Sequence, residues 1–188
     1  MEVFDPKTQT WELVVCPVAE RCRSRVSKSA VIEGRILYMF LDGGVAYKPR
    51  EDSWEAIQGP SRLEIGWPQR SYCVVDNVLC CFRNPDGVKW YDSEGQDWMN
   101  MKGLRGLPRF DVYSVLGVAD YGGKLAVLWA SGLRANGYGY KEKTIWCAVI
   151  VLEKRNGGEE IWGVVECIDP VLTVPAAYDM VRALAATV

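Results

Sequence analysis

The sequence has no histidine among its 188 residues. Serine and cysteine nucleophiles usually depend on a histidine base, and histidine is the commonest protein ligand of transition metals. The chain also has neither a Walker-type phosphate loop nor a G-x-G-x-x-G pattern that follows a strand. These absences disfavour hydrolytic, metal-dependent and nucleotide-dependent enzymes. We therefore expect no catalytic residues, no metal site and no cofactor.

Long apolar runs and an excess of positive charge are lacking as well. The longest unbroken apolar stretch, residues 145–152, has eight residues and is far too short to cross a bilayer. The net charge is −2, and the densest basic cluster, residues 21–25, reads as a solvated loop before a strand. The N-terminus has no signal-peptide pattern. We expect neither a membrane nor a nucleic acid as partner, and a location in the cytoplasm, the nucleus or both.

The seven cysteines contain no C-x-x-C pair. They are Cys16, Cys22, Cys73, Cys80, Cys81, Cys147 and Cys167. Most fall in apolar stretches that are typical of strands, where a free cysteine behaves as a small hydrophobic residue. Because no histidine completes a common zinc site, we expect reduced thiols in a reducing compartment.

Three tryptophans recur at a nearly constant spacing. Trp11, Trp54 and Trp98 are 43 and 44 residues apart, and each follows an aromatic residue by seven positions. Those aromatic residues are Phe4, Tyr47 and Tyr91. Turn-forming residues lie between the members of each pair, so the pair is predicted to face across a β-hairpin. A period of this length is typical of β-propeller blades.

A second pattern recurs in phase with the tryptophans. Two apolar stretches flank each of the pairs Glu33-Gly34, Asp76-Asn77 and Gly122-Gly123. Such pairs supply the positive φ angles that two-residue hairpin turns need. The stretches are almost continuously apolar, as in strands that are covered on both faces. Each repeat is therefore predicted to form four short strands, as a hairpin, a loop and a second hairpin.

The fold prediction is all-β: a partial propeller over residues 1–168 with about three and a half four-stranded blades. The predicted half blade is 1–18, and the predicted blades are about 25–59, 67–103 and 108–168. We expect the C-terminal part of a longer propeller; the alternative is a small four-bladed closure completed by the C-terminal segment. Residues 169–188 are predicted to be a tail with a short helix, because apolar residues recur there at helical spacing. That helix either docks on the propeller or is offered to a partner.

The pattern resembles the kelch repeat, and more narrowly the kelch part of plant F-box/kelch-repeat proteins, over about residues 1–168. The residues that carry the resemblance and the repeat are Phe4, Trp11, Arg25, Gly34, Gly43, Gly44, Tyr47, Trp54, Asn77, Tyr91, Trp98 and Gly123. Asn77 departs from the motif glycine, and no diglycine follows Phe82. A blade tolerates both departures because Asn and Asp-Gly also occupy left-handed turn positions.

The resemblance implies a module that binds proteins. In that family an N-terminal F-box binds the Skp adaptor of a cullin-based, SCF-type ubiquitin ligase, and the propeller captures the target for ubiquitination. This chain contains no F-box, so the adaptor and the cullin are expected as partners only through an F-box outside it. The target itself is not named by the sequence. The alternatives are a free-standing kelch adaptor, a truncated product without a ligase role, and a metal-dependent kelch enzyme, which the missing histidines disfavour.

The target is expected to bind loops at one face of the propeller. The candidate loops are residues 41–47, 82–89 and 130–143. Side chains of the types enriched at protein interfaces mark the binding residues that we predict there. These residues are Arg134, Asn136, Tyr138, Tyr140, Arg83 and Asn84.

Overall fold

The computed structural model describes residues 2–13, 26–40, 43–57, 71–83, 86–95, 97–110, 115–131, 142–178 and 183. These residues form antiparallel β-strands and one turn of 3-10 helix, η2 (Asn156–Gly158). The chain divides into two compact units, Met1–Glu64 and Ile65–Val188. In the part of the chain that the structure describes, no helix is long and apolar enough to cross a membrane.

The first unit contains a two-stranded hairpin and a four-stranded meander. The hairpin pairs β1 (Glu2–Asp5) with β2 (Thr10–Leu13). The meander runs in the order β3 (Lys28–Ile32), β4 (Arg35–Phe40), β5 (Gly43–Lys48) and β6 (Ser53–Ile57). Burial alternates along β3, where Ala30 and Ile32 are buried while Val31 is exposed.

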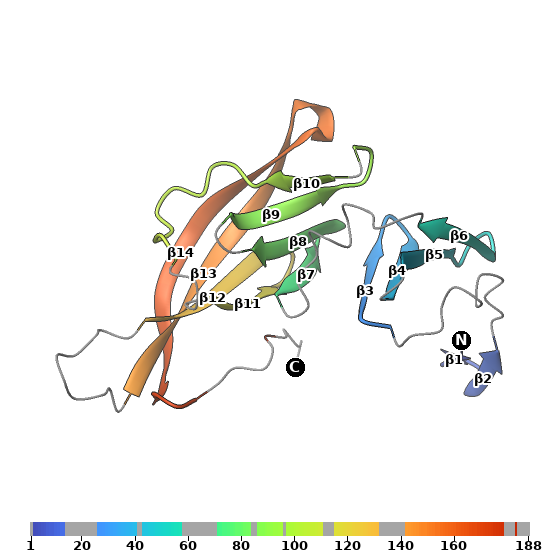
Figure 1. Ribbon diagram of the computed structural model, residues 1–188, viewed down its shortest axis with the longest axis horizontal. Coiled ribbons are helices and arrows are strands. Elements are labelled where there is room, and N and C mark those ends of the chain that lie inside the picture. Colours follow the sequence, from blue (N-terminus) through green and yellow to red (C-terminus); the bar gives the residue numbers. More distant parts are fainter. Residues whose placement is uncertain are drawn as a thin grey trace. The chain divides into compact units, whose positions relative to one another are not determined.

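The second unit contains two four-stranded meanders (Figure 1). One consists of β7 (Tyr72–Val75), β8 (Val78–Arg83), β9 (Gly87–Asp92) and β10 (Asp97–Asn100). The other consists of β11 (Val115–Asp120), β12 (Leu125–Ser131), β13 (Glu142–Arg155) and β14 (Glu160–Pro175). Meanders of four antiparallel strands are the building units of propeller blades.

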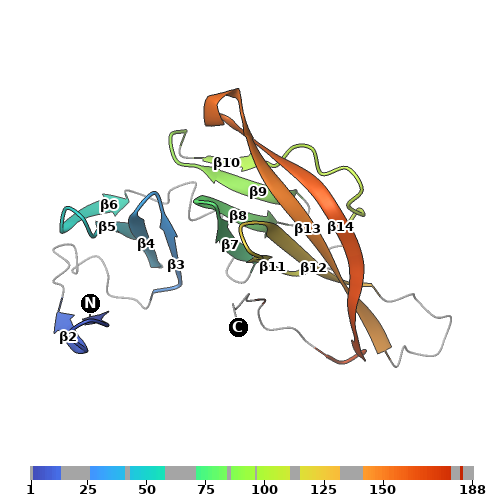
Figure 2. The ribbon, with the colours of Figure 1, turned by 180° about the vertical axis from the view of Figure 1, so that it is seen from behind.

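The core of the second unit lies between its two sheets, which face each other in both views (Figures 1 and 2). Val75 and Cys80 of one sheet share this core with Leu125, Val127 and Ile150 of the other, and all five are fully buried. The apolar faces of the two sheets thus cover each other, which explains part of the apolar runs in their strands.

The predicted hairpin turns have the backbone angles that the turn pairs indicate. Asp76 and Asn77 have φ angles of 45° and 67°, and Gly122 and Gly123 have φ angles of 59° and 79°. Two successive positive φ angles define the tight turn that matches the twist of a hairpin. Asn77 therefore serves in place of the motif glycine, because Asn tolerates the left-handed region.

The aromatic pairs that the tryptophan spacing predicts are direct cross-strand partners. Phe4 faces Trp11, Tyr47 faces Trp54, and Tyr91 faces Trp98. The ring centroids of these pairs are 5.1, 4.7 and 5.5 Å apart. The same motif thus closes the hairpin in three sheets, at separations where aromatic pairs attract each other.

The C-terminal tail differs from the prediction. β14 continues past residue 168 to Pro175, because the long strand β13 offers it a partner as far as Glu142. The predicted short helix is wrong for the described part of the tail, where Tyr178 donates its backbone N–H to the Pro175 carbonyl in a turn. The remaining positions of that helix, 179–182 and 184–188, lie outside the described residues.

Candidate functional site

Of the predicted binding residues, only Arg83 lies in the described part of the chain. It ends β8, directly before the β8–β9 turn, and its side chain is exposed. The other predicted binding residues lie outside the described residues, as does the motif residue Arg25. They are Asn84, Arg134, Asn136, Tyr138 and Tyr140.

Asp86 of the β8–β9 turn is paired with cations from the two strands that flank it. Asp86 accepts an ion pair from Lys89, with Nζ 3.2 Å from Oδ2, and a longer one from Arg83, with Nε 3.9 Å from Oδ2. One carboxylate is therefore shared by two cations. Ion pairs near the surface stabilise little, about 0–1 kcal/mol, so their main consequence is that the negative charge of Asp86 is compensated.

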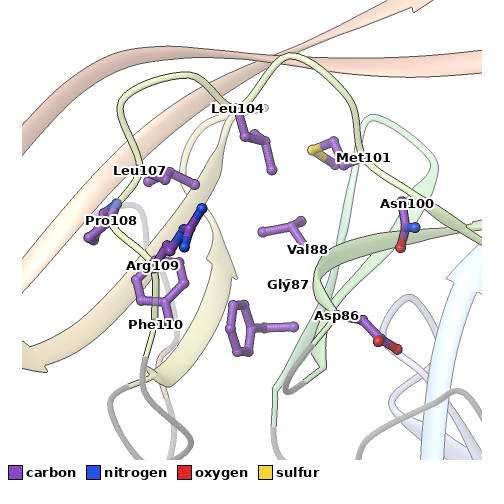
Figure 3. Close-up of a pocket in the computed structure, with 11 residues that line it drawn as sticks. Asp86, Gly87, Val88, Asn100, Met101, Leu104, Leu107, Pro108, Arg109 and Phe110 are labelled. Atoms are coloured by element: carbon purple, nitrogen blue, oxygen red, sulfur yellow. The ribbon is translucent and has the colours of Figure 1, made fainter.

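A cavity of about 480 Å³ lies beside this turn (Figure 3). One side comes from the β7–β10 sheet and its β8–β9 turn. The other side comes from the segment that leaves β10, residues 101–110, which we call the strap. The lining residues are Phe82, Asp86, Gly87, Val88, Asn100, Met101, Leu104, Leu107, Pro108, Arg109 and Phe110. The antiparallel order brings the two sides together, because β8 and β10 both end near the residues where β9 begins.

Backbone hydrogen bonds fix the start of the strap. Met101 donates to the Val88 carbonyl at 3.0 Å, and Lys102 donates to the Ile161 carbonyl at 3.3 Å. In return, Gly163 of β14 donates to the Lys102 carbonyl at 2.8 Å. The strap thus connects the outer strands of the two sheets of this unit.

Gly163 allows the strap to lie close to β14. A Cβ atom at this position would lie 2.4 Å from Leu104 Cδ2 and 2.9 Å from Ile150 Cγ2. Real Cβ atoms do not approach other atoms so closely, so a larger residue would force the Leu104 and Ile150 side chains to move. The glycine therefore leaves the room that Leu104 of the strap occupies against β14.

A polar cluster supports the same contact. Lys102 Nζ lies 2.6 Å from Glu160 Oε1, and Trp162 Nε1–H donates to the other oxygen of Glu160 at 2.9 Å. The hydrogen bond from Lys102, followed by that from Trp162, lowers the pKa of Glu160. Arg155 lies over the Trp162 ring at 4.2 Å from the centroid, which completes a charged patch outside the cavity.

The floor of the cavity is apolar. Phe82, Val88 and Met101 line the cavity and are buried. Phe110 packs edge-on against Phe82 with centroids 5.2 Å apart, and its other neighbour is Trp129 at 5.4 Å. Edge-to-face aromatic contacts contribute about 0.5–1.5 kcal/mol beyond the buried area, so the wall near Phe110 is held in place.

The rim of the cavity is polar. Asp86, Asn100 and Arg109 line it and are exposed. The strap contains Lys102, Arg105 and Arg109 but no acidic residue. Among the described residues, Lys102 has an ion pair with Glu160, whereas Arg109 has none. The guanidinium of Arg109 is thus available to a ligand at the opening.

Three of the described thiols are poor nucleophiles. Burial raises the pKa of Cys73 to about 12 and raises the pKa of Cys80 and Cys147 as well. A thiol is a nucleophile only as thiolate, so these groups are inert near neutral pH. No group of three acidic, cysteine or histidine side chains that could hold a metal ion is found among the residues that the structure describes.

The sequence prediction missed the strap. It placed binding residues in the connections between second and third strands and gave no role to the connection that leaves β10. A signal was present, because residues 104–110 read Leu-Arg-Gly-Leu-Pro-Arg-Phe, in which apolar and basic side chains alternate around Gly and Pro. Cationic and large apolar residues together in a non-repeated connection are typical of binding loops.

Known proteins match the chain over its whole length. The sequence profile of the family described as "FKB95, Kelch-repeats domain" matches residues 1–172. The Arabidopsis thaliana protein "F-box/kelch-repeat protein At4g39550" is 50% identical over 189 residues, which cover 100% of this chain and 46% of that protein. "F-box/kelch-repeat protein At4g39580" of the same plant is 43% identical and covers 100% of this chain and 48% of its own length. The chain thus spans about half the length of these relatives.

Proposed function

Because this chain belongs to the kelch-repeat family of plant F-box/kelch-repeat proteins, we propose that it is the target-recognition part of an SCF-type ubiquitin ligase subunit. In this role the kelch sheets hold a target protein and an F-box binds the Skp adaptor, which connects the subunit to a cullin. The chain acts as a binding module rather than an enzyme, in the cytoplasm, the nucleus or both.

The observation that carries the proposal is the match of the entire chain to proteins whose names combine an F-box with kelch repeats. The printed names describe those proteins, and the ligase role extends to this chain by family membership. The geometry of the cavity supports the binding part of the proposal. A preformed apolar opening with a few polar groups at its rim is the usual form of a recognition site.

A rigid scaffold suits this task. The strap is tied to strands by backbone hydrogen bonds and by aromatic packing. Loops that are fixed before binding lose little conformational entropy when a partner docks, which favours affinity. In the proposed complex the module holds the target while a separate enzyme of the ligase transfers ubiquitin to a lysine of that target.

The test is to capture the tagged gene product from the cells that express it. We expect the Skp adaptor and a cullin to copurify, together with proteins that carry ubiquitin and that accumulate when the gene is deleted. Replacing Tyr138 and Tyr140 by alanine should remove those target proteins and leave the adaptor and cullin bound. Repeated failure to recover the adaptor and the cullin, with targets still bound, would instead favour a free-standing kelch adaptor.

A further inference from the structure

We propose that the cavity between the β8–β9 turn and the strap receives a large apolar side chain from an acidic segment of a target protein, and that Arg109 pairs with the adjacent carboxylate. This inference rests on the proposed function, in that the chain is taken to capture proteins. It adds the chemistry that the captured segment must have.

The apolar part of the ligand follows from the size and lining of the cavity. A volume of about 480 Å³ lies within the range of about 300–1,000 Å³ that is usual for ligand pockets. Phe82, Val88 and Met101 line it and are buried, and partly buried Leu104 and Leu107 of the strap line it as well (Figure 3). An aromatic or branched aliphatic side chain gains most from removing this surface from water.

The acidic part of the ligand follows from the charge at the rim. Arg109 and Asp86 are the charged residues among those that line the cavity. Asp86 is already paired with Lys89 and Arg83, whereas Arg109 has no ion pair among the described residues, so Arg109 is the uncompensated charge at the opening. An uncompensated positive charge attracts anionic partners and disfavours cationic ones.

The type and position of the cation favour a carboxylate. Arg109 presents a planar guanidinium, which can donate two parallel hydrogen bonds to the two oxygens of a carboxylate. Its neighbours in the chain are held in place, because Phe110 packs between Phe82 and Trp129 and Pro108 has a fixed φ angle. The guanidinium is therefore directed by a strap that is ordered before the ligand arrives.

The remaining polar group at the rim suits a peptide. Asn100, at the end of β10, is exposed and lines the opening. Its amide can both donate to a carbonyl and accept from an N–H, which are the two groups that a peptide backbone presents. The apolar lining of the cavity thus suits the apolar side chain of the ligand. Arg109 suits the neighbouring carboxylate, and Asn100 suits the backbone amide.

The experiment measures binding of fluorescent, Gly-Ser-flanked peptides to the full chain by anisotropy. The probe peptide has Glu-Phe-Glu at its centre. Two comparison peptides have Lys-Phe-Lys, which reverses the charge, and Glu-Ser-Glu, which removes the apolar side chain. We expect the Glu-Phe-Glu peptide to bind and both comparison peptides to bind weakly.

Two matched variants isolate the role of Arg109. Arg109→Glu should weaken binding of the Glu-Phe-Glu peptide by about tenfold or more and improve binding of the Lys-Phe-Lys peptide. Arg105→Glu makes the same change of charge on the same strap at a residue that does not line the cavity. It should alter binding by no more than about twofold, because only screened, long-range charge is lost.

Three results would overturn the inference. Equal binding of the Glu-Phe-Glu and Lys-Phe-Lys peptides would remove the role of charge. Equal losses in the two variants would show that general charge, and not Arg109, is responsible. If no peptide binds while the wild-type protein and Arg109→Glu both retain their targets in cells, the cavity is not the capture site, although the proposed function stands. Failure of the wild-type protein to capture any target in cells would reject the proposed function instead.

Discussion

Replacing Trp98 by alanine should destabilise the protein far more than the same replacement of Trp11, although both residues occupy the same position of the repeat. Each faces an aromatic residue across its hairpin, Tyr91 and Phe4 respectively. The two tryptophans differ in burial, because Trp98 is 8% exposed and Trp11 is 68% exposed. Burial, and not the motif, should therefore set the cost.

The magnitudes follow from the buried area. A tryptophan side chain has about 200 Å² to bury, and each Å² removed from water contributes about 25 cal/mol. The nine-tenths of Trp98 that is buried then corresponds to about 4–5 kcal/mol, and the third of Trp11 that is buried to about 1.5 kcal/mol. Since whole domains are stable by about 5–15 kcal/mol, Trp98→Ala should remove a large part of the stability of its unit.

Urea denaturation followed by far-UV circular dichroism measures the difference. We expect Trp98→Ala to lower the transition midpoint strongly and Trp11→Ala to lower it slightly. Trp98→Phe is the matched control, because it keeps an aromatic ring opposite Tyr91 and should lose less than the alanine variant. Equal losses at the two tryptophans would refute the reasoning, since the motif would then carry the same energy regardless of its surroundings.

Three further results should follow. Gly163→Ala places a Cβ atom 2.4 Å from Leu104, so it should cost about 1–3 kcal/mol in urea denaturation and weaken Glu-Phe-Glu peptide binding; unchanged binding would separate the strap's position from its function. Iodoacetamide should label exposed Cys167 long before the two buried thiols of β8, which mass spectrometry of peptides checks. Glu160 has a lowered pKa, so its stabilising contribution is present above the unfolded pKa and lost as pH falls through the folded one. Lys102→Met should raise that pKa in an NMR titration, and an unchanged titration would contradict the assigned cause.

The sequence predicted the hairpins because their determinants are local. The seven-residue spacing places Tyr47 opposite Trp54, and the angles at Asp76 and Asn77 follow from the turn that joins two apolar strands. A two-residue turn fixes the register of its strands, so one turn determines several cross-strand pairs. Sequence patterns of this length contain all the information that such a hairpin needs.

The tail and the strap could not be predicted in the same way because their determinants are distant in the sequence. From Ala177 onward, apolar residues recur at helical spacing. The residues up to Pro175 nevertheless pair with β13, and a turn closed by Tyr178 follows them. The strap depends on the absence of a side chain at Gly163, about sixty residues away along the chain. A glycine that is needed for close approach looks, in the sequence alone, like any other strand glycine.

The position of the cavity is nevertheless related to the repeat, through a place where the repeat is broken. Tyr47 and Tyr91 are equivalent repeat positions, so Gly44 of β5 corresponds to Val88 of β9. A Cβ atom at Gly44 would lie 2.6 Å from Met39 Sδ, so the diglycine is needed where Met39 fills the space above it. In the β7–β10 sheet, Phe82 faces Val88 instead, and both side chains line the cavity.

This exchange explains why a departure from the motif marks the candidate site. Where the glycine is kept, a fully buried methionine closes the space. At the equivalent place in the second unit, a valine and a phenylalanine form the base of an opening that the strap surrounds. A repeat position that serves only packing keeps the same residue type in each blade. Where a blade has another residue at that position, as at Val88, the local surface can differ and can serve binding. The same comparison predicts that Val88→Gly enlarges the cavity without disturbing the β8–β9 turn, which depends on Gly87 at a φ angle of 87°.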